Sequence, residues 1–130
     1  MTEPTTIEDR FGKCPYATAQ SLISGKWAIL LMHYLDDGPI RFNELLRQMP
    51  RMTHATLSTQ LKTLEENGLV QRVQYEAIPP HVEYSLTEIG HKFRPVIEAI
   101  EAWGREYISQ MNLSMGIQRT DCVTHWFRRS

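Results

Sequence analysis

The sequence predicts a mainly α-helical fold with one small β-hairpin. Three observations support this: a leucine pattern of helical period in the middle of the chain, a switch to period two directly after it, and a long apolar stripe beyond. The central segment places Leu57, Leu61 and Leu64 at i, i+4 and i+7, which is one narrow face of a helix. Thr53 can cap the start of this helix through its hydroxyl. Gly68 can end it in the left-handed conformation that other residues avoid.

Three helices and a short strand are expected before the turn that leads into this central helix. Pro15 suits a helix start, because proline at the first position needs no N–H partner. A second helix is expected over residues 26–35, and the Asp-Asp-Gly-Pro sequence after it is a strong turn signal. Residues 40–42 are expected to form a short strand, and a third helix then runs up to Pro50.

The segment after Gly68 is predicted to form the β-hairpin. Residues 70–75 and 81–86 both alternate with period two, and Pro79 and Pro80 lie in the break between them. Two helices joined by a short turn and followed by a hairpin is the order of a winged helix-turn-helix. In that geometry one helix crosses the phosphate backbone and the next lies in the DNA major groove.

A long helix is expected at the end of the domain. Thr87 is predicted to cap it, and Pro95 should kink or split it because proline lacks the N–H of the helical ladder. Its apolar stripe exceeds what the rest of the chain can cover, so the first and last helices are predicted to be dimerisation helices. The alternative is that the stripe packs back on its own core. The predicted dimer-interface residues are Tyr16, Ile97, Ile100, Trp103 and Tyr107.

Length and composition predict one globular domain. The chain has 130 residues, of which 42% are hydrophobic. We expect an N-terminal arm at 1–13, a winged helix-turn-helix domain with its dimerisation helices at 14–108, and a C-terminal tail at 109–130. Neither a signal peptide nor a stretch long enough to span a bilayer is visible, which predicts a cytoplasmic protein without a membrane partner. The two cysteines are then expected to be free thiols.

The charge pattern restricts DNA binding to a local surface. The net charge is -1, whereas a DNA-binding protein usually carries surplus cations. Basic residues nevertheless outnumber acidic ones between positions 41 and 75. The outer face of the central helix carries short hydroxyl, methyl and amine groups, which fit a major groove and can contact base edges. The predicted groove residues are Thr53, His54, Thr56, Ser58, Thr59 and Lys62, and the predicted phosphate or minor-groove contacts are Arg41, Arg51 and His81.

The chain resembles the HxlR-type winged helix family of bacterial transcription regulators, which is related to the MarR group. The resemblance runs from Cys14 to about Tyr107. It is carried by Cys14-Pro15, by Gly-Lys-Trp at 25–27, by Gly-Pro-Ile-Arg-Phe-Asn-Glu-Leu at 38–45, and by the segments 57–61, 64–70 and 79–87. The resemblance implies a homodimer that binds a pseudo-palindromic double-stranded DNA operator. It also implies sensing of oxidants or electrophiles, because many members use one cysteine near the N-terminus, which matches Cys14.

The departures from the family pattern concern cations. Members often carry a proline, a lysine and an arginine where this chain has His54, Ala55 and Gln60, and an arginine where it has His81. These changes remove cations or make the charge depend on pH, since histidine gains its proton below about pH 6.5. Each phosphate that a cation neutralises adds to DNA affinity. We therefore expect weaker operator binding than in a typical member, or a different operator.

Each of the two cysteines could have a functional role or none. The positive end of the helix dipole and the neighbouring cation Lys13 both favour the deprotonated, reactive form of the Cys14 thiol. Cys14 is therefore the candidate redox sensor. The alternative is that Cys14 is a small apolar residue buried under the helix start. Cys122 and His125 are only two potential ligands, too few for a metal site, so neither a metal nor another cofactor is predicted.

The predicted function is a dimeric, sequence-specific DNA-binding transcriptional regulator that responds to redox state or electrophiles through Cys14. Its expected partners are an operator, a second copy of the chain and a small-molecule or electrophile effector. The alternative is a winged-helix interaction module with weakened DNA readout. An enzyme such as a thiol peroxidase is disfavoured, because no histidine and carboxylate accompany Cys14 and no glycine-rich cofactor loop occurs.

Overall fold

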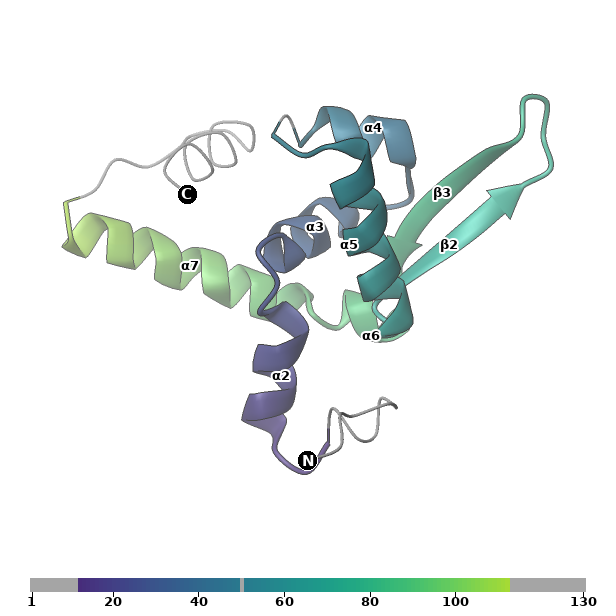
Figure 1. Cartoon of the computed structure of the whole chain (residues 1–130). Helices are drawn as coiled ribbons and strands as arrows, with labels where there is room; N and C mark the ends of the chain where they lie inside the picture. Colours follow the sequence, from purple (N-terminus) through teal and green to yellow (C-terminus); the bar gives the residue numbers. More distant parts are fainter. Residues whose placement is uncertain (1–11, 50, 113–130) are drawn as a thin grey trace.

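The computed structural model describes residues 12–49 and 51–112 (Figure 1). The predicted arm and the tail with Cys122 and His125 lie outside the described residues, apart from a few positions at their inner ends. The described helices are α2 (Pro15–Ile23), α3 (Ala28–Leu35), α4 (Phe42–Arg47), α5 (His54–Glu66), α6 (Glu88–His91) and α7 (Arg94–Gln110). The described strands are β1 (Ile40–Arg41), β2 (Val70–Tyr75) and β3 (His81–Leu86). This confirms the predicted fold class.

The hydrophobic core lies where α3, α4 and α5 meet the base of the sheet. Leu31 and Leu35 of α3 and Leu45 of α4 are completely buried there. The three leucines of α5 are also buried, which confirms the helical face read from the sequence. Each fully buried leucine stabilises the fold by roughly 1.5–3 kcal/mol, so this face holds α5 firmly against the core.

The sheet has three antiparallel strands in the order β1-β3-β2. β2 and β3 form the predicted hairpin, with Val70 opposite Leu86 at the buried base and Tyr75 opposite His81 near the tip. The short strand expected at 40–42 is β1, and it pairs with β3 through Ile40 and Tyr84. The hairpin therefore projects from the core as a wing whose β3 strand is also paired with β1 (Figure 1).

The predicted helix caps are present. The Thr53 hydroxyl accepts a hydrogen bond from the Thr56 backbone N–H at 3.1 Å. The Thr87 hydroxyl accepts one from the Gly90 N–H at 3.2 Å. Gly68 follows α5 with φ +80, the left-handed region in which glycine carries no steric penalty.

The last helix is split, as Pro95 predicted, but the break lies just before the proline. α6 ends at His91, and α7 begins at Arg94 with Pro95 in its first turn. A proline fits the first turn because its missing N–H would have no partner there in any case. α7 continues to Gln110, slightly beyond the domain boundary expected at 108.

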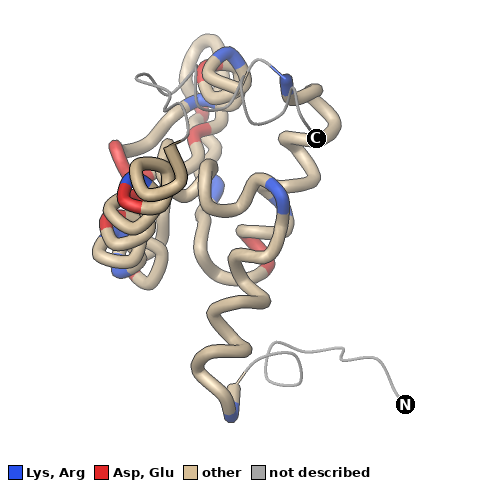
Figure 2. The backbone as a smooth tube through the Cα atoms, turned by 90° about the vertical axis from the view of Figure 1, so that its left-hand side faces the viewer, with Lys and Arg blue, Asp and Glu red and all other residues tan. Residues whose placement is uncertain are grey.

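Two helices leave most of their surface uncovered. α2 has no buried residue, and in α7 only Ile97 is buried, with 8% of its surface exposed. α2 contains no charged residue and is drawn entirely in tan in Figure 2, whereas α7 carries both acidic and basic residues. The apolar stripe therefore packs on the described core only at its start, around Ile97, whereas Trp103 and Tyr107 farther along α7 remain exposed.

Candidate nucleic-acid interface

The candidate interface is the face of α5 opposite its buried leucines. From the cap to Thr63, the exposed side chains of this helix are those of Thr53, His54, Ala55, Ser58, Thr59, Lys62 and Thr63, and Glu65 and Glu66 in its last turn are also exposed. Thr56 and Gln60 are half-buried. Up to Thr63 the interface is thus mainly a strip of hydroxyl, methyl and amine groups, which are small enough to enter a major groove.

Internal hydrogen bonds decide what each threonine can offer to DNA. The Thr59 hydroxyl donates to the Ala55 carbonyl at 3.0 Å, and the Thr63 hydroxyl donates to the Thr59 carbonyl at 3.1 Å. Their protons are therefore occupied, and they present acceptor lone pairs and methyl groups. Thr53 caps the helix and donates to the Thr56 hydroxyl at 2.9 Å, so its first role is structural.

Ser58 and Lys62 are the strongest candidates for direct DNA contact on α5. They lie four residues apart, so both point to the same side of the helix. Both are exposed, and neither has a hydrogen-bond or ion-pair partner among the described residues. An ammonium group and a hydroxyl in these positions can serve a phosphate or a base edge without first breaking an internal contact.

His54 is held by an aromatic neighbour. Its ring centroid lies 4.5 Å from that of Phe42, the first residue of α4, and Phe42 lies 6.3 Å from Tyr84 of β3. His54 is still exposed, so its nitrogens remain accessible while the ring is oriented. This cluster of three rings joins the start of α5 to α4 and the wing, a connection that the sequence pattern did not reveal.

The arginines predicted to contact the backbone are exposed around the helix pair. Arg41 immediately precedes α4 and lies opposite Glu83 in the β1–β3 register. Arg51 is exposed in the turn before α5. The wing adds Arg72, an exposed cation on β2 that was not selected as a site residue from the sequence. The sequence signal that could have identified Arg72 was its position between residues 41 and 75, where basic residues outnumber acidic ones.

His81 is engaged within the wing. Its Nε2 lies 3.0 Å from Oε2 of Glu83, and its ring stacks on Tyr75 at a centroid distance of 4.9 Å. The His81 and Glu83 side chains are only 18% and 25% exposed. A phosphate contact by His81 stays a prediction, and it would compete with the Glu83 carboxylate for the same ring nitrogen.

Cys14 is a free, exposed thiol at the N-cap of α2. Its backbone carbonyl accepts from Thr18 N–H at 3.0 Å, and its side chain makes no capping hydrogen bond. The Thr18 hydroxyl instead accepts from the Gly12 N–H at 3.0 Å, which folds the preceding turn over the first turn of α2. Exposure argues against the buried apolar role considered for Cys14 and leaves the thiol accessible to reagents.

No other chemical centre is visible in residues 12–49 and 51–112. This part of the chain contains no group of three or more histidine, cysteine, aspartate or glutamate side chains that could hold a metal ion. Over the same residues, none of the helices combines the length and the apolar character needed to cross a membrane.

The helix pair and wing match a known family, described as HxlR-like helix-turn-helix, over residues 22–112. The chain belongs to this family. It is 43% identical over 99 residues to the HTH-type transcriptional regulator YdeP of Bacillus subtilis (strain 168), covering 76% of this chain and 77% of the relative. It is 47% identical over 91 residues to the HTH-type transcriptional regulator BH0655 of Halalkalibacterium halodurans, covering 69% of this chain and 80% of the relative.

Solved structures of similar regulators have the same fold. The redox regulator HypR in its reduced form superposes with a TM-score of 0.71 at 37% identity, covering 76% of this chain and 98% of that one. The transcriptional regulator YodB of B. subtilis in its reduced form superposes with a TM-score of 0.67 at 35% identity, covering 74% and 95%. The chain is therefore a DNA-binding helix-turn-helix transcriptional regulator, and it is not an enzyme.

Proposed function

We propose that this HxlR-like regulator acts in the cytoplasm as a homodimer that binds a pseudo-palindromic operator. One α5 helix of each subunit enters the major groove, and the wing lies against the neighbouring backbone or minor groove. The functional unit spans residues 14–108 and includes α2 and most of α7 as dimerisation helices. The observation that carries the proposal is the exposed strip of α5, which is directly opposite the leucines that fix this helix to the core.

The uncovered surfaces of α2 and α7 support the homodimer. Tyr16 on α2 is 87% exposed, and Trp103 and Tyr107 on α7 are 67% and 47% exposed and stack on each other at a centroid distance of 5.4 Å. Ile100 is half-buried. Ile97 already belongs to the chain's own core, so it has little surface left for a partner. Apolar area of this kind is normally covered by a partner, most often through two-fold symmetry.

The DNA-binding test is a titration of the full chain against its own upstream region and against random duplex of equal length, each at two salt concentrations. A sequence-specific regulator gives a ratio of affinities of at least about a thousandfold. Equal affinities would support the alternative of an interaction module with weakened DNA readout. Ser58→Ala and Lys62→Ala should each weaken specific binding, whereas Arg105→Ala, which removes an exposed cation of α7, should not.

The dimer test is a mass measurement by light scattering over a range of protein concentrations. The wild type should have the mass of two chains. Trp103→Glu places a charge in the proposed interface and should shift the equilibrium toward single subunits. The matched substitution Gln110→Glu at the end of α7 should leave the dimer intact. A wild type that stays a single subunit at micromolar concentration contradicts the dimer.

The proposal assigns oxidant and electrophile sensing to Cys14. The thiolate attacks one peroxide oxygen and breaks the O–O bond. The sulfur becomes a sulfenic acid, and the peroxide is reduced to hydroxide, which leaves as water after taking a proton. With a quinone, the thiolate adds to a ring carbon. The sulfenic acid can then condense with a thiol of the other subunit, which breaks the S–O bond, forms a disulfide and releases water. This disulfide, or the quinone adduct, would displace α2 and change the angle between subunits.

Two features support this assignment, namely the exposure of the Cys14 thiol and the fold shared with the redox regulator HypR. Mass spectrometry of the native dimer after mild peroxide or quinone treatment tests it. Cys14 should gain one oxygen atom, a disulfide or a quinone adduct, and Cys14→Ser should make operator binding insensitive to the treatment. An unmodified Cys14 under conditions that modify free cysteine contradicts the sensor.

A further inference from the structure

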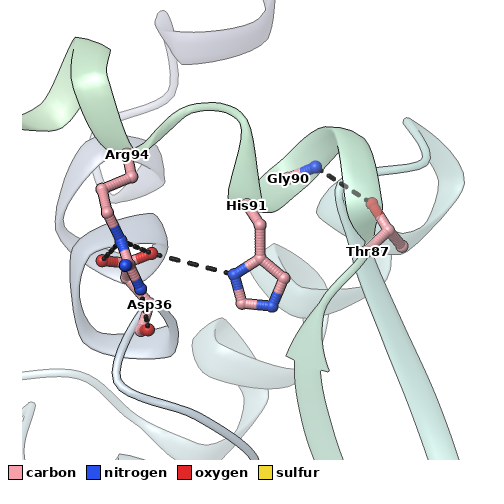
Figure 3. Close-up of polar contacts among 5 residues, drawn as sticks. All are labelled: Asp36, Thr87, Gly90, His91 and Arg94. Atoms are coloured by element: carbon pink, nitrogen blue, oxygen red, sulfur yellow. Dashed lines mark hydrogen bonds and ion pairs between the residues drawn. The ribbon is translucent and has the colours of Figure 1, made fainter.

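The junction between α6 and α7 is held to the core at two points, and Figure 3 shows the first of them together with the Thr87 cap of α6. The first point is an ion pair between Asp36, at the end of α3, and Arg94, at the start of α7. The Arg94 Nε lies 2.9 Å from Oδ2 and 3.2 Å from Oδ1 of Asp36, and Nη2 donates to the Asp36 carbonyl at 3.4 Å. Nδ1 of His91 lies 3.8 Å from Oδ1 of the same carboxylate.

This pair complements the dipoles of both helices. The C-terminus of α3 carries partial negative charge, and it receives the guanidinium of Arg94. The N-terminus of α7 carries partial positive charge, and it lies beside the carboxylate of Asp36. The hydrogen bond to Asp36 and the charge of that carboxylate both raise the pKa of Arg94 above its ordinary value. The Asp36 side chain is only 18% exposed, so the carboxylate is partly shielded from water and depends on this partner.

The second point ties α6 to the end of the DNA-reading helix. The Thr87 hydroxyl donates to the carbonyl of Gly68, directly after α5, at 2.6 Å. The Thr87 N–H donates to the carbonyl of Leu69 at 3.0 Å. α6 is therefore fixed relative to α5, and what remains adjustable is the angle at the turn of residues 92–93 that leads into α7.

Few contacts other than the ion pair restrain this angle. Ile97 is the only buried residue of α7, and Phe93 is packed against the core just before it. Beyond Ile97 the helix runs away from the rest of the chain (Figure 1). Its 17 residues make a lever of roughly 25 Å at about 1.5 Å per residue. A turn of about 10° at the junction moves the far end by roughly 4 Å, more than the rise of about 3.4 Å per base pair.

We propose that the Asp36–Arg94 pair is a positioning contact that fixes the direction of α7 relative to α5, and so sets the distance between the two DNA-reading helices of the dimer. The inference rests on the proposed dimeric operator binding. Neither residue is required to touch DNA. Their effect is on which separation of two half-sites the dimer accepts.

The experiment selects bound duplexes from a pool of random sequence with the full-length protein and reads the separation between paired half-sites. The wild type should enrich one half-site sequence at one separation. Arg94→Ala should enrich the same half-site sequence, with the separation shifted by at least one base pair or spread over several values. Arg105→Ala is the matched control, because it also removes an arginine from α7 but breaks an ion pair with Glu101 of the same helix. It should keep the wild-type separation.

Restoration of the pair distinguishes positioning from general damage to the fold. The double variant Asp36→Arg with Arg94→Asp keeps an ion pair across the same gap and should recover a single separation, whereas Asp36→Arg alone should not. If Arg94→Ala does not fold, as judged by circular dichroism, Arg94→Lys replaces it. Lysine keeps the charge but loses the fork of donors that grips the carboxylate, so the spread of separations should still widen.

Two results would overturn the inference, and they differ from each other. If the wild type enriches no paired half-sites, dimeric operator binding fails and this inference fails with it. If the wild type enriches one separation and folded Arg94→Ala enriches it equally narrowly, operator binding stands and the positioning role of the pair is wrong.

Discussion

Replacing Gly90 by alanine should destabilise the domain strongly, because α6 lies in close contact with the backbone at the start of the wing. Gly90 is buried. A methyl group built there would overlap the carbonyl oxygen of Leu69 and lie 3.2 Å from Cβ of Leu86. The overlapped atom belongs to the backbone, so it cannot move aside as a flexible side chain would. α6 itself would have to shift.

The size of the effect follows from two contributions. Forcing an extra methyl into a packed site typically costs about 1–3 kcal/mol. Shifting α6 also weakens the hydrogen bond from Thr87 N–H to Leu69 O and that from the Thr87 hydroxyl to Gly68 O. Each of these is worth about 1 kcal/mol. We expect Gly90→Ala to lower the free energy of unfolding by about 2–4 kcal/mol, a large part of the total of about 5–15 kcal/mol for a typical domain.

Gly104 on α7 provides the matched control. It also lies inside a helix, but no atom lies within 4 Å of a methyl group built there. Gly104→Ala should therefore stabilise the domain by roughly 0.5–1 kcal/mol, the usual difference between alanine and glycine in a helix.

Urea unfolding followed by circular dichroism at one fixed protein concentration measures both variants, and light scattering checks that their oligomeric state is unchanged. If Gly90→Ala unfolds at the wild-type midpoint, the close contact between α6 and Leu69 is wrong, and so is the second anchor of the α6–α7 junction.

Three further predictions concern the DNA-reading helix and the wing. Thr53→Ala removes the cap of α5 and should cost about 1 kcal/mol of unfolding free energy, whereas Thr63→Ala in the same helix should stay within about 0.5 kcal/mol in the same assay. Leu61→Ala empties a site in the core and should cost about 2–5 kcal/mol; a loss below 1 kcal/mol would contradict the packing of α5. His81→Arg adds a permanent cation to the wing, so operator binding should tighten and the slope of log affinity against log salt should steepen by about one. An unchanged slope would show that position 81 does not contact phosphate.

Much of the fold could be predicted from the sequence because its signals are local. A hydroxyl at Thr53, leucines at i, i+4 and i+7, and Gly68 define α5 without reference to any other part of the chain. The same holds for the alternation of β2 and β3 and for the cap at Thr87. Residues on the outer face of α5 could also be named, because a helix with one buried stripe must expose the opposite side.

The details of the candidate site could not be predicted in the same way. The ring contacts of Phe42 with His54 and Tyr84 join three separate elements, and the pairing of His81 with Glu83 depends on how the wing is folded. A helical-wheel projection of α5 placed Thr59 among the groove residues. Only the structure shows that the Thr59 hydroxyl already donates its proton to the Ala55 carbonyl. Whether a polar side chain is available to DNA depends on partners that have no fixed spacing in the sequence.

The sequence by itself determined the elements, their order and the family, because each of these depends on residues close to one another in the chain, although α3 begins two residues later and α4 ends before the position expected. Only the tertiary structure decided that β1 joins β3, that α7 leaves the core after Ile97, and that Arg94 meets Asp36 58 residues away. The physical reason is that packing and ion pairing act through space. Their partners are chosen by how the helices meet, and the angle of α7 is set by contacts that no local pattern records.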